Sequence, residues 1–175
     1  FTILRYSGPQ PPTLTPFIDF RGKTGNKIFF GSILSLEFQG ISRSGNLVGL
    51  WSYSCRCYTN SVRIQYFRYG MYITSDYYNS LFDYTSFANC DYGFRAESLG
   101  NSASFHDCMF YVCNIGIGHA LSTYGCTGIY INNCMFEGLK TAIRSSLGSS
   151  LHISNCYFEG FSEYMIDIFS GGDNI

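Results

Sequence analysis

The chain has 175 residues, enough for one domain with a hydrophobic core. Its 11 Lys and Arg nearly balance its 12 Asp and Glu, and only 13% of its residues are charged, so it lacks the basic stripe that a nucleic-acid-binding protein would carry. No apolar run approaches the roughly 18 residues that span a bilayer, and neither nucleic acid nor a membrane is expected as a partner.

All four prolines lie near the start of the chain, at positions 9, 11, 12 and 16. We expect residues 1–27 to form an extended lead-in or part of an earlier coil, because proline suits extended connections and strand edges. The segment has no secretory signal pattern, and we interpret the chain as a fragment of a longer protein. The 15 Tyr, 16 Phe and 19 Gly of the whole chain favour strands and turns, and therefore an all-β fold.

From residue 28 onward the sequence repeats. Segments 81–88, 104–111, 130–137 and 152–159 align without gaps, and the series extends toward the N-terminus at a nearly constant spacing of its marker positions. These markers form one apolar set: Phe38, Ile64, Phe87, Phe110, Phe136 and Phe158. Each repeat of about 23 residues contains three short alternating strands separated by polar or Gly-containing turns.

One such repeat cannot bury its apolar side alone, so neighbouring repeats must share a core. The sequence therefore predicts a single-stranded parallel β-helix over residues 28–175, with three strands in each coil. A β-sandwich, with a strand about every 8–12 residues, would not keep the marker positions in register.

Two further sets of equivalent positions follow from this alignment. Thr85, Cys108, Cys134 and Cys156 are expected to be small buried residues, with the cysteines reduced; the alternative is a disulfide framework. Turn positions that suit a ladder of amides bonded to the next turn's backbone are Tyr84, Asp107, Asn133 and Asn155.

No metal or cofactor is expected. Cys55-x-Cys57 and Cys108-x4-Cys113 lack the Cys-x2-Cys spacing of a zinc site. The sequence also has no phosphate-binding loop, dinucleotide fingerprint or catalytic-triad motif.

The pattern apolar-x-apolar-x-Asn-Cys-x-Phe at 129–136, with Gly-apolar as in Gly93-Phe94, resembles the repeat of right-handed parallel β-helices of the pectate-lyase-like superfamily. The tyrosine-rich, weakly charged version is most similar to bacteriophage tailspikes and capsule depolymerases. The resemblance covers residues 28–175 and is specific for the fold. It implies a homotrimeric, extracellular virion-tail protein that binds, and often cleaves, a bacterial surface polysaccharide.

Outward residues at equivalent positions stack about 4.8 Å apart in such a fold. One set, Gln39, Gln65, Ala88, Tyr111, Glu137 and Glu159, ends in two carboxylates on adjacent coils. Glu137 and Glu159 are therefore candidates for the acid and base of a glycosidase, or else two solvated surface groups. Asp83 and His106, also on adjacent coils, are a second catalytic candidate, in which the carboxylate orients the imidazole for proton transfer.

The third strand of each coil supplies candidate substrate-binding residues. Arginines beside carboxylates could hold an acidic sugar or neutralise its charge in a lyase; they could equally be surface pairs worth less than about 1 kcal/mol each. With Tyr111, the set comprises Tyr72, Arg95, Glu97, Arg144 and Asp167. Aromatic rings that stack on sugars or cover neighbouring coils are expected at Trp51, Tyr66, Tyr69, Tyr72, Tyr77, Tyr78 and Tyr92.

An apolar set on the outer surface predicts an interface. Met109, Met135 and Tyr157 occupy equivalent outward positions, and a contiguous apolar stripe usually marks an association surface. We expect this face to form the trimer interface.

The leading hypothesis is a tailspike-like protein that binds polysaccharide and hydrolyses it with paired carboxylates. The alternatives are a non-catalytic fibre or adhesin that only binds glycan, and a pectate-lyase-like polysaccharide lyase.

Overall fold

The structure, a computed structural model, describes residues 2–19, 28–74, 79–97, 102–119, 128–146 and 150–169. Every regular element within these ranges is a β-strand, and the strands form three parallel sheets, here called A, B and C. The expected all-β fold is confirmed.

Each sheet runs the length of the molecule. Sheet A consists of β1 (Thr2–Arg5), β4 (Leu36–Gln39), β7 (Arg63–Gln65), β10 (Ser86–Ala88), β13 (Met109–Tyr111), β16 (Met135–Glu137) and β19 (Tyr157–Glu159). Sheet B consists of β2 (Thr15–Asp19), β5 (Leu47–Ser52), β8 (Tyr69–Ile73), β11 (Tyr92–Ala96), β14 (Ile115–His119), β17 (Thr141–Ser146) and β20 (Tyr164–Phe169). Sheet C consists of β3 (Ile28–Leu34), β6 (Ser54–Asn60), β9 (Ser80–Asp83), β12 (Ala103–His106), β15 (Ile129–Asn132) and β18 (Leu151–Ser154).

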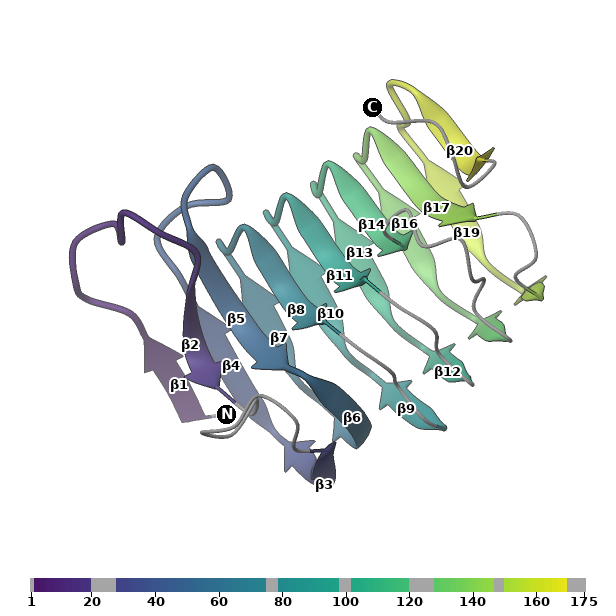
Figure 1. Cartoon of the computed structure of the whole chain (residues 1–175). Coiled ribbons are helices and arrows are strands. Elements are labelled where there is room, and N and C mark those ends of the chain that lie inside the picture. The colour runs from purple at the N-terminus through teal and green to yellow at the C-terminus, as the bar shows by residue number, and fades with distance from the viewer. Residues whose placement is uncertain are drawn as a thin grey trace.

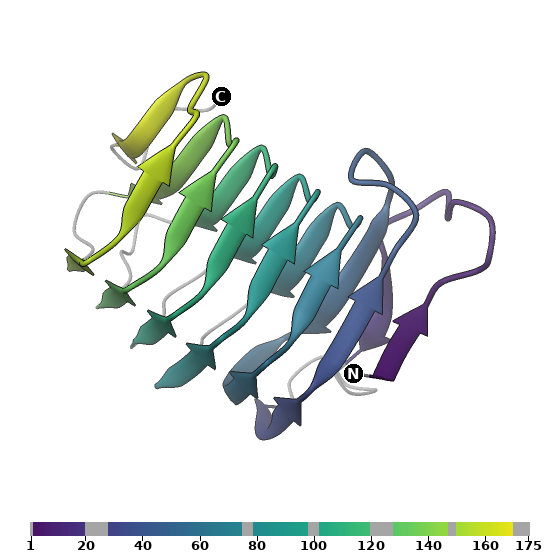
Figure 2. The ribbon, with the colours of Figure 1, turned by 180° about the vertical axis from the view of Figure 1, so that it is seen from behind.

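The chain passes through sheet C, then A, then B, and each circuit is one coil of a β-helix (Figure 1). Each strand pairs in parallel with its counterpart in the next coil, so the coils stack along one axis, with the start and end of the chain at opposite ends of the stack (Figure 2). Sheet C contains six strands, one for each coil that the sequence predicts.

The predicted marker positions lie opposite one another in sheet A, from Phe38 to Phe158. The rings of the last four stack face to face, with centroids 5.1, 4.8 and 4.9 Å apart along Phe87, Phe110, Phe136 and Phe158. A second stack joins Phe82 to Phe105 at 4.7 Å in sheet C. These rings form the centre of one continuous core, as the repeat predicts.

The corner between sheets C and A contains a residue with left-handed backbone in every coil from β3 to β19, and from β7 onward so does the corner between sheets A and B. Between sheets C and A, φ lies between 45° and 54° at Ser35, Ser61, Tyr84, Asp107, Asn133 and Asn155. The expected ladder of amides bonded to the next turn's backbone is not seen among the described residues at this corner; one bond joins side chains instead, from the Asn133 amide to the Asp107 carboxylate. Asn and Asp tolerate this backbone region better than most residues do.

The cysteines are reduced, as predicted, at every position whose side chain is described. None of these six forms a disulfide: Cys57, Cys90, Cys108, Cys113 and Cys134 are buried, and Cys156 is half-buried. The Cys108 thiol donates to the Phe82 carbonyl at 3.3 Å, and Cys134 donates to the Phe105 carbonyl at 3.4 Å. Thiols in this column therefore hydrogen-bond backbone carbonyls inside the coil corner. The side chains of Cys55 and Cys126 lie outside the described residues.

A glycine column brings sheet B close to its neighbouring coils. A Cβ added at Gly49, Gly70, Gly93 or Gly116 would lie 2.5–2.8 Å from a carbonyl oxygen of the next coil. Only glycine fits this approach without a shift of the backbone.

The lead-in contributes two strands to the stack. β1 pairs with β4, and β2 pairs with β5, each at the end of its sheet. Pro16 lies within β2, a terminal strand with a partner on one side only, which is where a strand tolerates proline. Residues 20–27 lie outside the described residues.

Candidate functional site

The outward columns predicted from sequence are in register, but they lie on three different faces. Glu137 and Glu159 lie on sheet A, Asp83 and His106 on sheet C, and the arginine-rich set on sheet B. The candidate residues therefore do not converge on one site within a single chain.

On sheet A, Glu137 lies opposite Glu159, and Tyr111 opposite Glu137. Glu159 accepts a hydrogen bond from the Tyr157 hydroxyl, and this bond raises the pKa of Tyr157. Parallel strands bring equivalent residues to about 4.8 Å, close to the roughly 5–5.5 Å between the carboxyl groups of a retaining glycosidase. The geometry is compatible with the proposed pair.

The apolar column lies beside these carboxylates. Met109 lies opposite Met135, and Met135 opposite Tyr157. Both methionines are half-buried, whereas 53% of Tyr157 is exposed. The predicted outward stripe exists, and its role as an interface stays a prediction.

On sheet C, Asp83 lies opposite His106. Asp83 accepts a hydrogen bond from the Asn60 amide at 3.2 Å, on the preceding coil, and within the described residues no hydrogen bond joins it to His106. The His106 side chain is exposed. The proposed orientation of the imidazole by the carboxylate is therefore not formed in this arrangement.

On sheet B, the predicted residues form a compact cluster. The Tyr72 hydroxyl donates to Glu97 Oε1 at 2.8 Å, and Arg95 Nε donates to the same oxygen at 2.9 Å. The Arg95 guanidinium also lies 4.8 Å from the ring centroid of Tyr92 and 5.0 Å from that of Tyr69. Cation–π contacts of this kind stabilise a partly desolvated guanidinium.

This environment changes the protonation behaviour of the cluster. Burial, together with the hydrogen bond to Glu97, raises the pKa of Tyr72 well above that of a free tyrosine. Burial alone would lower the pKa of Arg95, but the adjacent Tyr69 and Glu97 outweigh it and raise that pKa. Arg95 therefore stays charged and Tyr72 stays neutral over the physiological pH range.

The second arginine of sheet B, Arg144, also forms an ion pair with a carboxylate of its own chain. Arg144 Nε contacts Asp167 Oδ2 at 2.7 Å. Gly118 separates Arg144 from Arg95 in the column, and the Tyr92 ring covers it, since an added Cβ would lie 2.7 Å from that ring. The charged groups of sheet B are mostly engaged with one another.

Trp51 and Tyr69 extend this aromatic cover, as the sequence predicts. The Trp51 ring lies 5.0 Å from that of Tyr72, and the Tyr69 ring 4.9 Å from it. Tyr69 and Tyr72 are buried in this second apolar cluster, which favours the interpretation that they cover the coils. Tyr66 is exposed at a corner, and Tyr77 and Tyr78 lie outside the described residues.

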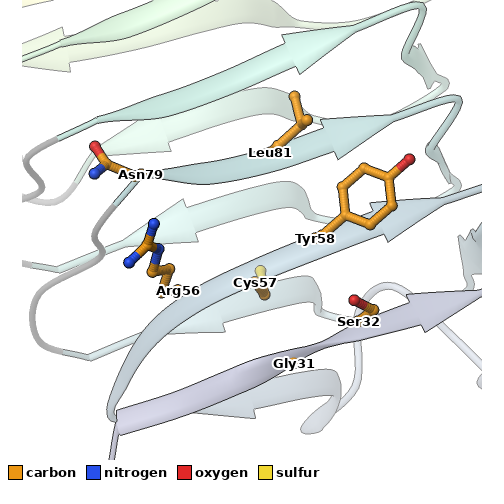
Figure 3. Close-up of a pocket in the computed structure, with 7 residues that line it drawn as sticks. All are labelled: Gly31, Ser32, Arg56, Cys57, Tyr58, Asn79 and Leu81. Carbon is orange, nitrogen blue, oxygen red and sulfur yellow. The ribbon is translucent and has the colours of Figure 1, made fainter.

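The outer face of sheet C contains a hollow that sequence reasoning missed. It has a volume of about 380 Å³ and is lined by Gly31, Ser32, Arg56, Cys57, Tyr58, Asn79 and Leu81. In Figure 3, Arg56 and Asn79 lie toward one end of the strands, and the Tyr58 ring lies toward the other. The repeat spacing could have indicated that Tyr58 and Leu81 lie side by side, because Tyr58 lies one repeat before Leu81 and opposite it in the sheet.

The polar groups of this hollow retain hydrogen-bond donors. The Tyr58 oxygen accepts from the Asn60 amide at 2.9 Å, which leaves its own proton free to donate. The Asn79 oxygen accepts from Ser102 at 2.6 Å, and no hydrogen bond within the described residues uses its NH₂ group. Arg56 is exposed, and no carboxylate of the described residues contacts its guanidinium.

Farther along sheet C, the same column continues with exposed rings. The Tyr130 ring stacks on the His152 imidazole with centroids 4.8 Å apart. In the adjacent column, the Asn132 amide donates to the Ser154 hydroxyl at 2.7 Å. Sheet C thus presents aromatic rings and neutral hydrogen-bonding groups along successive coils.

The described residues contain no group of three or more His, Cys, Asp or Glu side chains that could hold a metal ion. Among the same residues, no helix is long and apolar enough to cross a membrane.

Compared with known protein families, curated proteins and solved structures, the chain matches none.

Proposed function

We propose that this β-helix binds an extended polysaccharide along the outer face of sheet C. The observation that carries the proposal is the hollow of β3, β6 and β9, which opens onto a column of polar and aromatic side chains. Saccharides combine hydroxyl groups with flat C–H surfaces, which suit convergent polar groups and aromatic rings. Sheet C offers both at the spacing of the coils.

The resemblance of the repeat to tailspikes suggests where this protein acts and how it assembles. In that setting the chain is part of an extracellular virion-tail protein, and three chains associate through the stripe of Met109, Met135 and Tyr157. Tyr157, of which 53% is exposed, supports this use of sheet A, because a partner chain could cover its ring. Sheet C would remain open to a bacterial surface polysaccharide.

A second function, glycosidic hydrolysis, is favoured by one specific observation. Glu137 and Glu159 are paired in register on adjacent strands, and two carboxylates at short separation can act as nucleophile and acid–base in a retaining mechanism. Tyr157 holds one of them through its hydroxyl. In this proposal Glu137 is the acid–base, and Glu159 is the nucleophile. The cleavage site on sheet A would then meet the polysaccharide at the groove between two chains of the trimer.

Binding and cleavage are tested together on a panel of bacterial capsular and O-antigen polysaccharides. We expect Tyr130→Ala to weaken binding by up to about ten-fold, because it removes an exposed ring whose stacking contact is worth roughly 0.5–1.5 kcal/mol. The matched control is Tyr164→Ala, which removes from sheet B a tyrosine that is 55% exposed, against 43% for Tyr130. Equal effects of the two substitutions, or no binding to any polysaccharide, would contradict the binding proposal.

Cleavage is measured in the same panel as release of reducing ends. Glu137→Gln and Glu159→Gln are each expected to abolish release while leaving binding within about two-fold, because amides keep the shape and lose the acid–base chemistry. Glu163→Gln, at another exposed glutamate, serves as the control. If wild-type protein binds polysaccharide without releasing reducing ends, the hydrolase proposal is wrong and the non-catalytic binder remains.

A further inference from the structure

We infer that the hollow between β3, β6 and β9 binds the carboxylate of an acidic sugar, so that the polysaccharide recognised by sheet C contains uronic acid units or related acidic sugars. This inference rests on the polysaccharide-binding function proposed above and specifies its substrate class.

The first argument is the identity of the lining groups. Arg56, Tyr58 and Asn79 all present donors, and among the lining residues that the structure describes there is neither Asp nor Glu. A neutral sugar hydroxyl both donates and accepts, so a site for neutral sugars would offer acceptors as well. With Arg56 as its cation and Ser32 as its one hydroxyl of mixed character, this donor-rich lining suits a group that only accepts, which describes an ionised carboxylate.

The second argument is that Tyr58 and Asn79 accept, and do not donate, in their hydrogen bonds to the rest of the chain. The Asn60 amide occupies the Tyr58 oxygen, and the Ser102 hydroxyl occupies the Asn79 oxygen. Each bond uses the acceptor of the lining residue and leaves its donor available. The arrangement therefore turns one acceptor of each residue to the chain itself and leaves its donors for a ligand.

The third argument is the contrast between arginines. Arg95 and Arg144 are each held by a carboxylate of their own chain, Glu97 and Asp167. Arg56 has no such partner among the described residues and lies at a concave surface. A guanidinium binds a carboxylate through two parallel hydrogen bonds, and Arg56 retains the donors for that geometry.

The hollow also offers an apolar surface beside the cation. Tyr58 and Leu81 lie opposite each other on β6 and β9 and are half-buried. A uronic acid has a carboxylate at one carbon of an otherwise ordinary pyranose ring, so its C–H face can lie on Tyr58 and Leu81 while its carboxylate reaches Arg56. The site thus fits an acidic sugar better than a simple anion.

The test uses oligosaccharides of glucuronate, galacturonate and mannuronate, each with its carboxyl-reduced neutral counterpart, which keeps the linkages and removes the charge. We expect the wild-type chain to bind at least one acidic oligosaccharide about ten-fold more tightly than its reduced form, as a charge-assisted bidentate contact predicts. Arg56→Gln should remove this difference, and Arg56→Lys should retain part of it.

The matched control is Arg63→Gln, which removes the same charge from an exposed position on sheet A. It should leave the preference for the acidic form unchanged. Because Arg56 is exposed, its variants should keep the melting temperature of the wild-type chain, which is checked by circular dichroism.

Three outcomes would overturn the inference. Equal binding of acidic and carboxyl-reduced oligosaccharides, with loss of both on Tyr130→Ala, would refute the acidic sugar and leave the polysaccharide proposal standing. Equal losses for Arg56→Gln and Arg63→Gln would indicate diffuse charge attraction in place of a site. Binding of none of these oligosaccharides, together with no polysaccharide bound in the larger panel, would refute both proposals.

Discussion

Tyr72 and Arg95 donate hydrogen bonds to the same oxygen of Glu97, and three tyrosine rings surround the guanidinium. Sequence spacing identified Tyr72, Arg95 and Glu97 as neighbours, but their use depends on which groups remain free. Their donors and acceptors are largely satisfied within the chain, so the cluster mainly stabilises the outer layer of sheet B. For single residues, the burial of the side chain and its hydrogen-bond partners within the chain indicate whether it can still bind a ligand.

A pH titration tests this role of Tyr72. A free tyrosine ionises near pH 10, and the folded chain raises the pKa of Tyr72 above that value. Above about pH 10 the unfolded state therefore binds fewer protons, so the free energy of unfolding falls as pH rises, whereas below pH 10 the contribution of Tyr72 is intact. We expect Tyr72→Phe to be about 1–2 kcal/mol less stable than wild type at pH 8.

This difference should narrow steadily above pH 10, since phenylalanine cannot ionise. Urea denaturation at several pH values measures it. Tyr164→Phe, at a tyrosine that is 55% exposed, should follow the wild-type curve. A Tyr72→Phe deficit that stays constant up to about pH 11.5 would show that the hydroxyl proton of Tyr72 is not held by the folded chain.

The corners and the glycine column determine how the strands meet. Two residues separate sheets C and A in most coils, as at 84–85, 107–108 and 133–134, and one of them has left-handed backbone. Three residues separate sheets A and B at 89–91, 112–114 and 138–140. Inside sheet B, the glycines allow each coil to approach the carbonyl of the next. These short elements hold the register on which all outward columns depend.

Gly93→Ala tests the close approach in sheet B. The added methyl would lie 2.8 Å from the Gly116 carbonyl oxygen and 2.9 Å from the Phe110 ring, so we expect the free energy of unfolding to fall by about 2–3 kcal/mol. Gly138→Ala is the comparison, because its added methyl would meet no atom closer than 3.5 Å. Its only cost is that alanine must adopt the left-handed backbone of Gly138, which destabilises by about 1 kcal/mol. Chemical denaturation of both variants measures the order, and a Gly93→Ala variant as stable as Gly138→Ala would show that the coils can separate without cost.

The elements of this fold were predictable because one quantity, the nearly constant spacing of the marker positions, fixes strand pairing for the whole stack. It placed Phe110 on Phe136 and Glu137 beside Glu159, and both pairings are confirmed. It did not identify the hollow around Arg56, since the hollow depends on side-chain bonds such as that from Asn60 to Tyr58. Nor did it show that Asp83 bonds to Asn60 in preference to His106. Register follows from periodicity, whereas the choice among possible partners does not.

In the molecule as a whole, the three outer faces differ in chemistry. Sheet A presents apolar groups and two carboxylates, sheet B presents closed ion pairs over aromatic rings, and sheet C presents free donors. A fibre made of several such chains needs one face for its partners and another for its ligand. The division among faces is compatible with that arrangement.

Oligomeric state tests the role assigned to sheet A. We expect the chain to be a trimer in solution and Met135→Glu to make it monomeric, because a charge would be buried in an apolar contact. Tyr164→Glu places the same charge on sheet B and should leave the trimer intact. Light scattering after size-exclusion chromatography measures the mass. A monomeric wild-type chain, or a trimer unaffected by Met135→Glu, would contradict the assignment.

The lengths of the connections between sheets also indicate where this fold tolerates insertions. The connections from sheet B to sheet C vary in span, from residue 53 alone before β6 to residues 120–128 before β15, while the corners on either side of sheet A hardly change from β6 to β18. Inserted chain at the variable connections would leave the pairing of every coil untouched. A β-helix of this kind could therefore gain additional modules beside sheet C without a change in how its strands pair.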